Sequence, residues 1–242
     1  MVFRENSENI IINTTTRPNP SKKQIISKAY SYHSQGNILE AAKYYQYCIQ
    51  KKFNDYRVFS NYGVLLRDLG KLKEAEKNIR KALEINPNFA DAYSNLGLIL
   101  SDLGKLEEAK LSYLKAIQLN PNIGNTYYNL GTILKDFGNL KEAEISYRKA
   151  IELSPNHADA HLNLGSILSE IGNLKEAESS TRKVIELKSC YAEAHANLGG
   201  ILRELGNLQE AEVSTRKAIE LSPNLAMAHS NLGVILREVG KL

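Results

Sequence analysis

The fold is decided by residues 197–221, which read NLGGILRELGNLQEAEVSTRKAIEL. The stretch 34 residues earlier, residues 163–187, is identical to it at 19 of 25 positions. Further steps of 34 residues find an asparagine and a glycine at the same spacing, from Asn61 and Gly63 to Asn231 and Gly233. A fixed period of this length is typical of a repeat protein, in which each unit packs against its neighbours.

The third copy, residues 90–123, shows the pattern of one unit. Its large and small residues have the spacing of two helix faces separated by a glycine and closed by a proline: Tyr93, Leu96, Gly97, Leu100, Gly104, Ala109, Tyr113, Ala116 and Pro121. This order resembles the tetratricopeptide repeat (TPR) family. The resemblance implies an all-α fold, an α-solenoid in which helix-turn-helix units form a right-handed superhelix.

The period divides the chain into a leader, six full repeats and an incomplete one. Residues 1–21 are polar without a helical period and are expected to be a flexible leader. The repeats are expected at residues 22–55, 56–89, 90–123, 124–157, 158–191 and 192–225, followed by the first helix of a seventh at 226–242. Phe53 and Ser189 replace the proline that closes other units, so looser turns are expected there.

The last helix carries an apolar stripe of Leu232, Ile235, Leu236 and Val239, and no second helix follows it. An exposed stripe of this kind usually has a cover. We expect the natural chain to continue past Leu242, or this helix to self-associate or to pack against a partner.

Charge and composition favour a cytoplasmic protein that binds neither nucleic acid nor membranes. The net charge of +4 comes from residues 1–55, because acids and bases cancel over 56–242. There is no run of about 18 apolar residues and no signal peptide. The two cysteines, Cys48 and Cys190, lie four repeats apart, which predicts free thiols in a reducing compartment.

One position on the expected inner face of the first helix is asparagine in every unit from the second onward. This asparagine ladder consists of Asn61, Asn95, Asn129, Asn163, Asn197 and Asn231. A carboxamide offers a donor and an acceptor together, so it can pair with the backbone of an extended protein or peptide segment whatever its side chains are. The alternative is that these asparagines only tie adjacent helices together.

Seven residues further on, the same face carries one acid in each unit from the second onward. These acids are Asp68, Asp102, Asp136, Glu170, Glu204 and Glu238. On a binding face they favour basic or hydroxyl-bearing ligands; otherwise they are solvated charges at helix ends. TPR domains that hold the C-termini of chaperones place Lys or Arg here, so acids argue against that ligand.

The sequences at 90–97 and 228–236 are similar to the repeat arm of O-linked N-acetylglucosamine transferases. In that family an asparagine ladder at this position grips substrate backbones, and the resemblance extends this role to the six asparagines above. The catalytic part of those enzymes is not matched. The sequence therefore favours a protein-interaction scaffold, with the substrate-recognition arm of a larger transferase as the alternative.

No enzymatic site, cofactor or metal centre is expected. His161, His195 and His229 recur every 34 residues, but equivalent positions in stacked repeats lie about 8–10 Å apart, too far to share one ion. They take the position of Phe59 and Tyr93, which indicates packing. The chain contains neither a phosphate-binding glycine loop nor a nucleophile motif.

Overall fold

The computed structural model describes residues 20–240, and this part of the chain contains thirteen α-helices and no strand. The expected all-α solenoid is therefore confirmed. The predicted leader, residues 1–21, lies outside the described residues except for its last two. Ser21 is the N-cap of the first helix and forms a capping box with Gln24.

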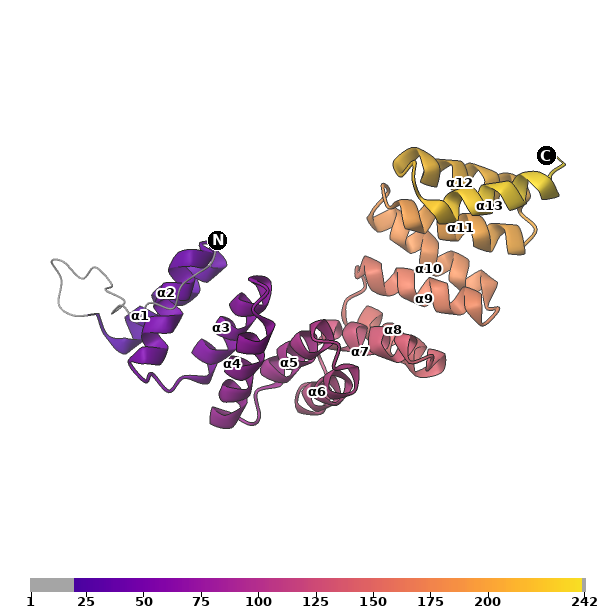
Figure 1. Ribbon diagram of the computed structural model, residues 1–242. Coiled ribbons are helices and arrows are strands. Elements are labelled where there is room, and N and C mark those ends of the chain that lie inside the picture. The colour runs from indigo at the N-terminus through magenta and orange to yellow at the C-terminus, as the bar shows by residue number, and fades with distance from the viewer. Residues whose placement is uncertain (1–19, 241–242) are drawn as a thin grey trace. The chain divides into compact units, whose positions relative to one another are not determined.

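The described chain forms two compact units, divided after Asn120. The first contains three helix pairs (Figure 1). Their bounds are α1 Lys22–Ser34, α2 Ile38–Gln50, α3 Tyr56–Asp68, α4 Leu72–Ile85, α5 Ala90–Asp102 and α6 Leu106–Leu119. Each first helix contacts its own second helix most extensively, and α2 and α4 also contact the first helix that follows.

The second unit contains three helix pairs and one further helix (Figure 1). Their bounds are α7 Gly124–Asp136, α8 Leu140–Leu153, α9 Ala158–Glu170, α10 Leu174–Leu187, α11 Ala192–Glu204, α12 Leu208–Leu221 and α13 Ala226–Glu238. Within this unit α11 also contacts α9 and α13, so successive first helices lie side by side. This neighbour relation allows residues at one repeated position to form a common surface.

Glycine in the middle of the first helices lets the second helix approach closely. A Cβ built on Gly97 would lie 2.5 Å from Cε1 of Tyr113, whose ring is only 1% exposed. A Cβ on Gly131 would lie 2.9 Å from the equivalent atom of Tyr147. Helix packing therefore explains a residue type that otherwise destabilises a helix interior by about 1 kcal/mol.

The glycine after each first helix has a different role, illustrated by Gly206. Its φ of 81° is left-handed, a conformation that a residue without Cβ adopts most easily. The amide of Gly206 donates to Arg203 O, and that of Asn207 donates to Leu202 O, which is a Schellman motif. The turn thus satisfies the last carbonyls of α11 and directs the chain into α12.

Of the two turns without proline, only the first differs from the others. Helix α2 ends at Gln50, and Lys52 has a φ of 55°, the only non-glycine residue in the described chain with positive φ. The expected looser turn at Ser189 is wrong. Helix α10 ends at Leu187 as its equivalents do, and the Tyr191 amide donates to Lys188 O just as the His157 amide donates to Ser154 O in a turn that has proline.

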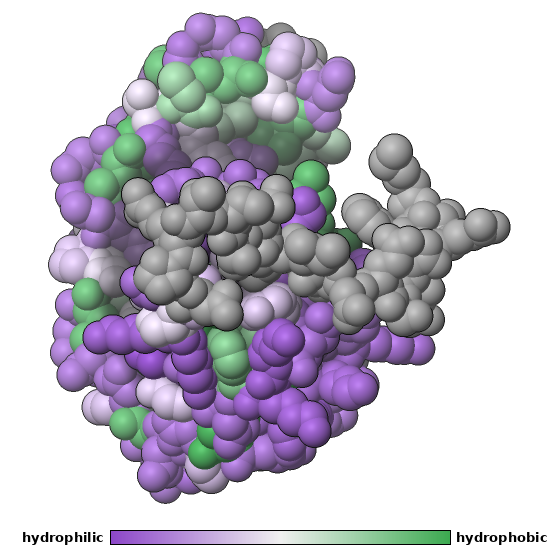
Figure 2. All heavy atoms as spheres, turned by 90° about the vertical axis from the view of Figure 1, so that its left-hand side faces the viewer, coloured by the Kyte–Doolittle hydropathy of each residue, from purple (hydrophilic) through white to green (hydrophobic). Residues whose placement is uncertain are grey.

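The apolar stripe of α13 is partly covered. Ile235 is fully buried against Leu198, Leu202 and Ala211 of α11 and α12. The other stripe residues are half-buried, and no atom lies within 4 Å of a Cβ built on Gly233. Figure 2 shows that the face of the molecule turned to the viewer is mainly hydrophilic, with hydrophobic residues scattered singly or in small groups.

Candidate functional site

Each predicted site residue lies on a first helix. The six asparagines are all half-buried, and the six acids are all exposed and each forms the last residue of its helix. The first unit carries Asn61 and Asp68 on α3, and Asn95 and Asp102 on α5; the second carries the remaining pairs on α7, α9, α11 and α13. Because asparagine and acid are seven residues apart, they share one face of each helix.

Some of the carboxamides already have partners. Asn231 Nδ2 donates to Ala196 O over 3.0 Å, which ties α13 to α11. Asn163 is a partner of the Tyr147 hydroxyl. Burial raises the pKa of Tyr147 to about 12, and hydrogen bonds with Thr132 and, to a smaller extent, with Asn163 partly offset this rise. The helix-tying role is thus present at Asn231, while its partial exposure leaves part of the side chain accessible.

A hollow of about 280 Å³ in the second unit brings four of the predicted residues together. It lies between α9, α11 and α13 and is lined by Ser166, Ser169, Glu170, Asn197, Gly200, Ile201, Glu204, Met227 and Asn231. We call it the acidic hollow. Two carboxamides, two carboxylates and two hydroxyl side chains line this space, so it can accept and donate hydrogen bonds and attract a cation.

The other predicted residues do not line the acidic hollow. Asn129, Asn163, Asp136 and Glu238 belong to the same unit but are not part of its wall. Asn61, Asn95, Asp68 and Asp102 belong to the other unit.

Five residues of the hollow are absent from the predicted set. Ser166 and Gly200 lie three residues after the ladder asparagines, and Met227 lies four before Asn231, so helical spacing places them on the same face. Ile201 lies four residues after Asn197 and shares that face too, whereas Ser169 lies at a neighbouring phase of the helix and has no comparable sequence signal.

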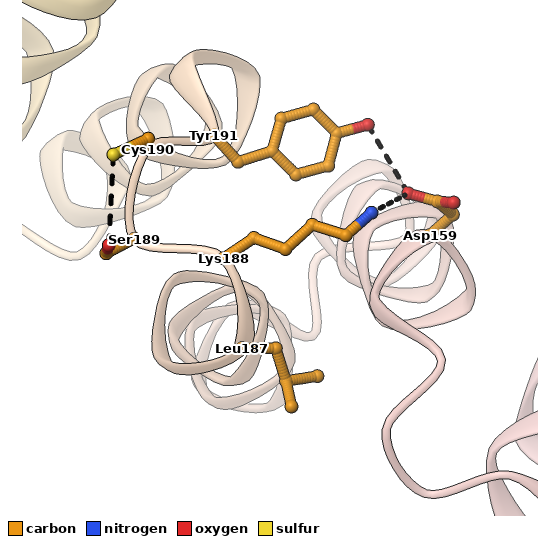
Figure 3. Close-up of a pocket in the computed structure, with 6 residues that line it drawn as sticks. All are labelled: Asp159, Leu187, Lys188, Ser189, Cys190 and Tyr191. Atoms are coloured by element: carbon orange, nitrogen blue, oxygen red, sulfur yellow. Dashed lines mark hydrogen bonds and ion pairs between the residues drawn. The ribbon is translucent and has the colours of Figure 1, made fainter.

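A second, larger hollow of about 740 Å³ surrounds the turn between α10 and α11 (Figure 3). Figure 3 shows Lys188 and Tyr191 pointing toward Asp159 of α9. Lys188 Nζ lies 3.3 Å from Asp159 Oδ1, and the Tyr191 hydroxyl lies 3.5 Å from the same oxygen. These polar ends satisfy one another and join α9 to the turn, which favours a structural role.

The three periodic histidines secure the turns before the first helices. His161 Nε2 lies 2.9 Å from Pro155 O, His195 Nε2 2.9 Å from Ser189 O, and His229 Nε2 2.7 Å from Pro223 O. Since carbonyl oxygens only accept, each ring nitrogen donates.

No cluster of three or more His, Cys, Asp or Glu side chains in residues 20–240 has an arrangement suited to a metal ion. Over the same residues, no helix combines the length and apolar character that crossing a membrane requires.

The paired helices and the repeated face of their first members define an α-solenoid of helix-turn-helix units. Five family models match the chain, four described as tetratricopeptide repeat and one as TPR repeat. They match residues 90–123, 63–104, 124–157, 146–179 and 192–225, together more than half of the chain. The chain therefore belongs to the tetratricopeptide repeat family. These models describe the repeat in general and do not single out the repeats of glycosyltransferases.

Solved structures resemble the chain over most of its length. The crystal structure of YrrB, described as a TPR protein with an unusual peptide-binding site, has 29% sequence identity and a TM-score of 0.69, covering 78% of this chain and 98% of YrrB. MamA has 25% identity and a TM-score of 0.63, covering 71% of this chain and 93% of MamA. PilF of Pseudomonas aeruginosa, at 18% identity, shares the fold with a TM-score of 0.79, covering 88% of this chain and 97% of PilF. A search of curated proteins gives no significant match.

Proposed function

We propose that this chain is a protein-interaction scaffold that binds an extended segment of a partner protein along the faces of its first helices. The five repeats that we assign to residues 56–225, and α13, each present one half-buried asparagine on this face. The observation that carries the proposal is the acidic hollow, where Asn197 and Asn231 meet two carboxylates from neighbouring helices. The peptide-binding site described for YrrB supports the same kind of ligand.

The chemistry of the asparagines suits a peptide backbone. Each carboxamide can accept from a backbone N–H and donate to a C=O, which an extended segment presents along its length. Asn231 uses one N–H of its Nδ2 for Ala196 O, so its Oδ1 and its second N–H remain for a ligand. Each such hydrogen bond contributes about 0.5–1.5 kcal/mol, and because several helices each supply one, their contributions to the free energy of peptide binding add up.

The chain needs no catalytic residue of its own for this role, because a scaffold binds its partner without changing it chemically. We place the protein in the cytoplasm, which suits its free thiols, the buried Cys48 and the exposed Cys190.

The same face would serve the substrate-recognition arm of a larger transferase, the alternative suggested by the similarity of residues 90–97 to such arms. The two roles differ in whether a catalytic domain follows the array, which the gene sequence beyond codon 242 reveals. Self-association through α13 is a further proposal, supported by its half-buried stripe. Molecular mass measured over a concentration series tests it.

The proposal is tested with peptides selected from a random-peptide phage library against the full chain. Changing Asn129, Asn163 and Asn197 together to alanine should weaken the selected peptides at least roughly tenfold, because three hydrogen-bonding groups are lost. The triple change avoids Asn231, whose carboxamide holds α13.

A matched control replaces three exposed turn asparagines, Asn54, Asn156 and Asn224, with alanine. Circular dichroism melting of both variants checks that the helices remain folded. Equal peptide affinity in the two variants would remove the asparagine ladder from the account.

A further inference from the structure

The acids that end the first helices differ in whether the preceding first helix supplies them with a cation. Arg67 Nε of α3 lies 2.6 Å from Asp102 Oδ2 of α5. Arg203 Nη1 of α11 lies 3.7 Å from Glu238 Oε1 of α13. At the equivalent position of α9 the residue is Ser169. The acid that ends α11 therefore lacks the cation that its counterparts on α5 and α13 receive.

The carboxylates of the acidic hollow are accordingly only partly neutralised. Within residues 20–240, Glu204 has one ion-pair partner, Arg203 of its own helix at 3.5 Å, and this arginine also pairs with Glu238. Glu170 forms no ion pair with any residue between 20 and 240, although Lys135 stands at the position that could supply one. Of the two carboxylates that line the hollow, Glu170 thus has no paired cation, and Glu204 shares the Arg203 guanidinium with Glu238.

The hollow also has room for a side chain. At the position of Gly200 the other first helices carry side chains, among them Ser166 on α9 and Val234 on α13. Its volume of about 280 Å³ is below the range of about 300–1,000 Å³ of pockets for drug-sized ligands. A space of this size suits one long side chain better than a whole small molecule.

We infer that the acidic hollow receives a lysine or arginine side chain of the bound segment, whose charge replaces the cation missing at Ser169. This inference rests on the proposed function, because it names the side chain that accompanies the gripped backbone. Asn197 and Asn231 line the same hollow as the two carboxylates, so backbone and side chain of one residue can be bound at the same place. The aliphatic part of that side chain can lie against Ile201 and Met227, which also line the hollow.

The experiment uses the same phage library on four forms of the full chain. The wild type should enrich lysine or arginine at one position of the aligned peptides. Ser169→Arg supplies the missing cation, and the double change Glu170→Gln with Glu204→Gln removes the charges, so both should lose this enrichment. Ser101→Arg, which adds the same charge at the equivalent position of α5, should keep it.

Affinity then measures the size of the effect. A selected peptide should bind the wild type more tightly than its norleucine twin by roughly two- to fivefold, the effect of one partly exposed ion pair. Ser169→Arg should abolish this difference while the norleucine peptide keeps its affinity. Melting curves confirm that each variant is folded.

The outcomes separate the inference from the proposed function. Peptides that depend on the ladder asparagines but show no basic residue would overturn the inference and leave the scaffold role standing. Basic peptides that Ser169→Arg binds as well as the wild type does would also overturn it. If no peptide is selected at all, both ideas fail.

Discussion

A methyl group added to the glycines of the first helices tests the packing that creates the binding face. In Gly97→Ala the new Cβ would lie 2.5, 2.6 and 2.8 Å from three ring atoms of Tyr113. The ring is 1% exposed and cannot turn away, so helix or ring must shift. Overpacking of this kind costs about 1–3 kcal/mol, and three close contacts place the change near the upper end. The gain in helix propensity, about 1 kcal/mol, leaves a net loss of about 2 kcal/mol.

Two further glycines make this a graded series. Gly131→Ala meets the Tyr147 ring at 2.9 Å and should destabilise less. Gly233→Ala meets no atom within 4 Å and should be neutral or stabilise α13 by up to about 1 kcal/mol. Urea unfolding followed by circular dichroism gives the midpoints, and amide exchange locates the change. Equal effects at Gly97 and Gly233 would refute the packing explanation.

Three other perturbations have expected outcomes. Burial raises the pKa of Tyr147 to about 12, above about 10 for free tyrosine, so its stabilisation is complete below pH 10 and is lost as the pH rises through 12. Alkaline unfolding should therefore shift to higher pH in Tyr147→Phe. Tyrosinate absorbance and circular dichroism give the pH midpoint of unfolding, and a midpoint equal to that of the wild type would contradict this expectation. Asn231→Ala removes the bond to Ala196 O and should destabilise α13 by about 1 kcal/mol, seen as faster amide exchange there. His195→Phe loses the 2.9 Å bond to Ser189 O, so the amides of this turn should exchange faster; unchanged protection would mean that packing alone holds it.

Most of the fold is predictable because the same pattern of residues recurs every 34 positions. In three repeats a glycine and a large residue stand at the same spacing, as Gly97 and Tyr113 do, which indicates two closely packed helices. The turn at Ser189 shows a limit of this reasoning. Proline marks where a helix ends, but this turn forms without it and keeps the backbone hydrogen bond from Tyr191.

The candidate site is less predictable, because it depends on how neighbouring helices meet. Periodicity places Asn197 and Asn231 on one face, but only coordinates show that the Asn231 amide donates to Ala196 O. The hollow exists where Gly200 has no side chain beside the next first helix, and Ser169 lines it from a neighbouring phase of α9. The hydrogen bond and the hollow depend on side-chain rotamers and on how the helices are placed. The residue type at one repeated position does not determine either of these.

Contact between the carboxamides and a bound peptide is the most direct test of the central claim. The side-chain amide signals of a ¹⁵N-labelled full chain can be followed while a library-selected peptide is added to saturation. We predict that the signals of Asn129, Asn163 and Asn197 shift, and that those of the turn residues Asn156 and Asn224 do not. A saturated peptide that leaves the three ladder signals unchanged would contradict the proposal that these asparagines grip the partner.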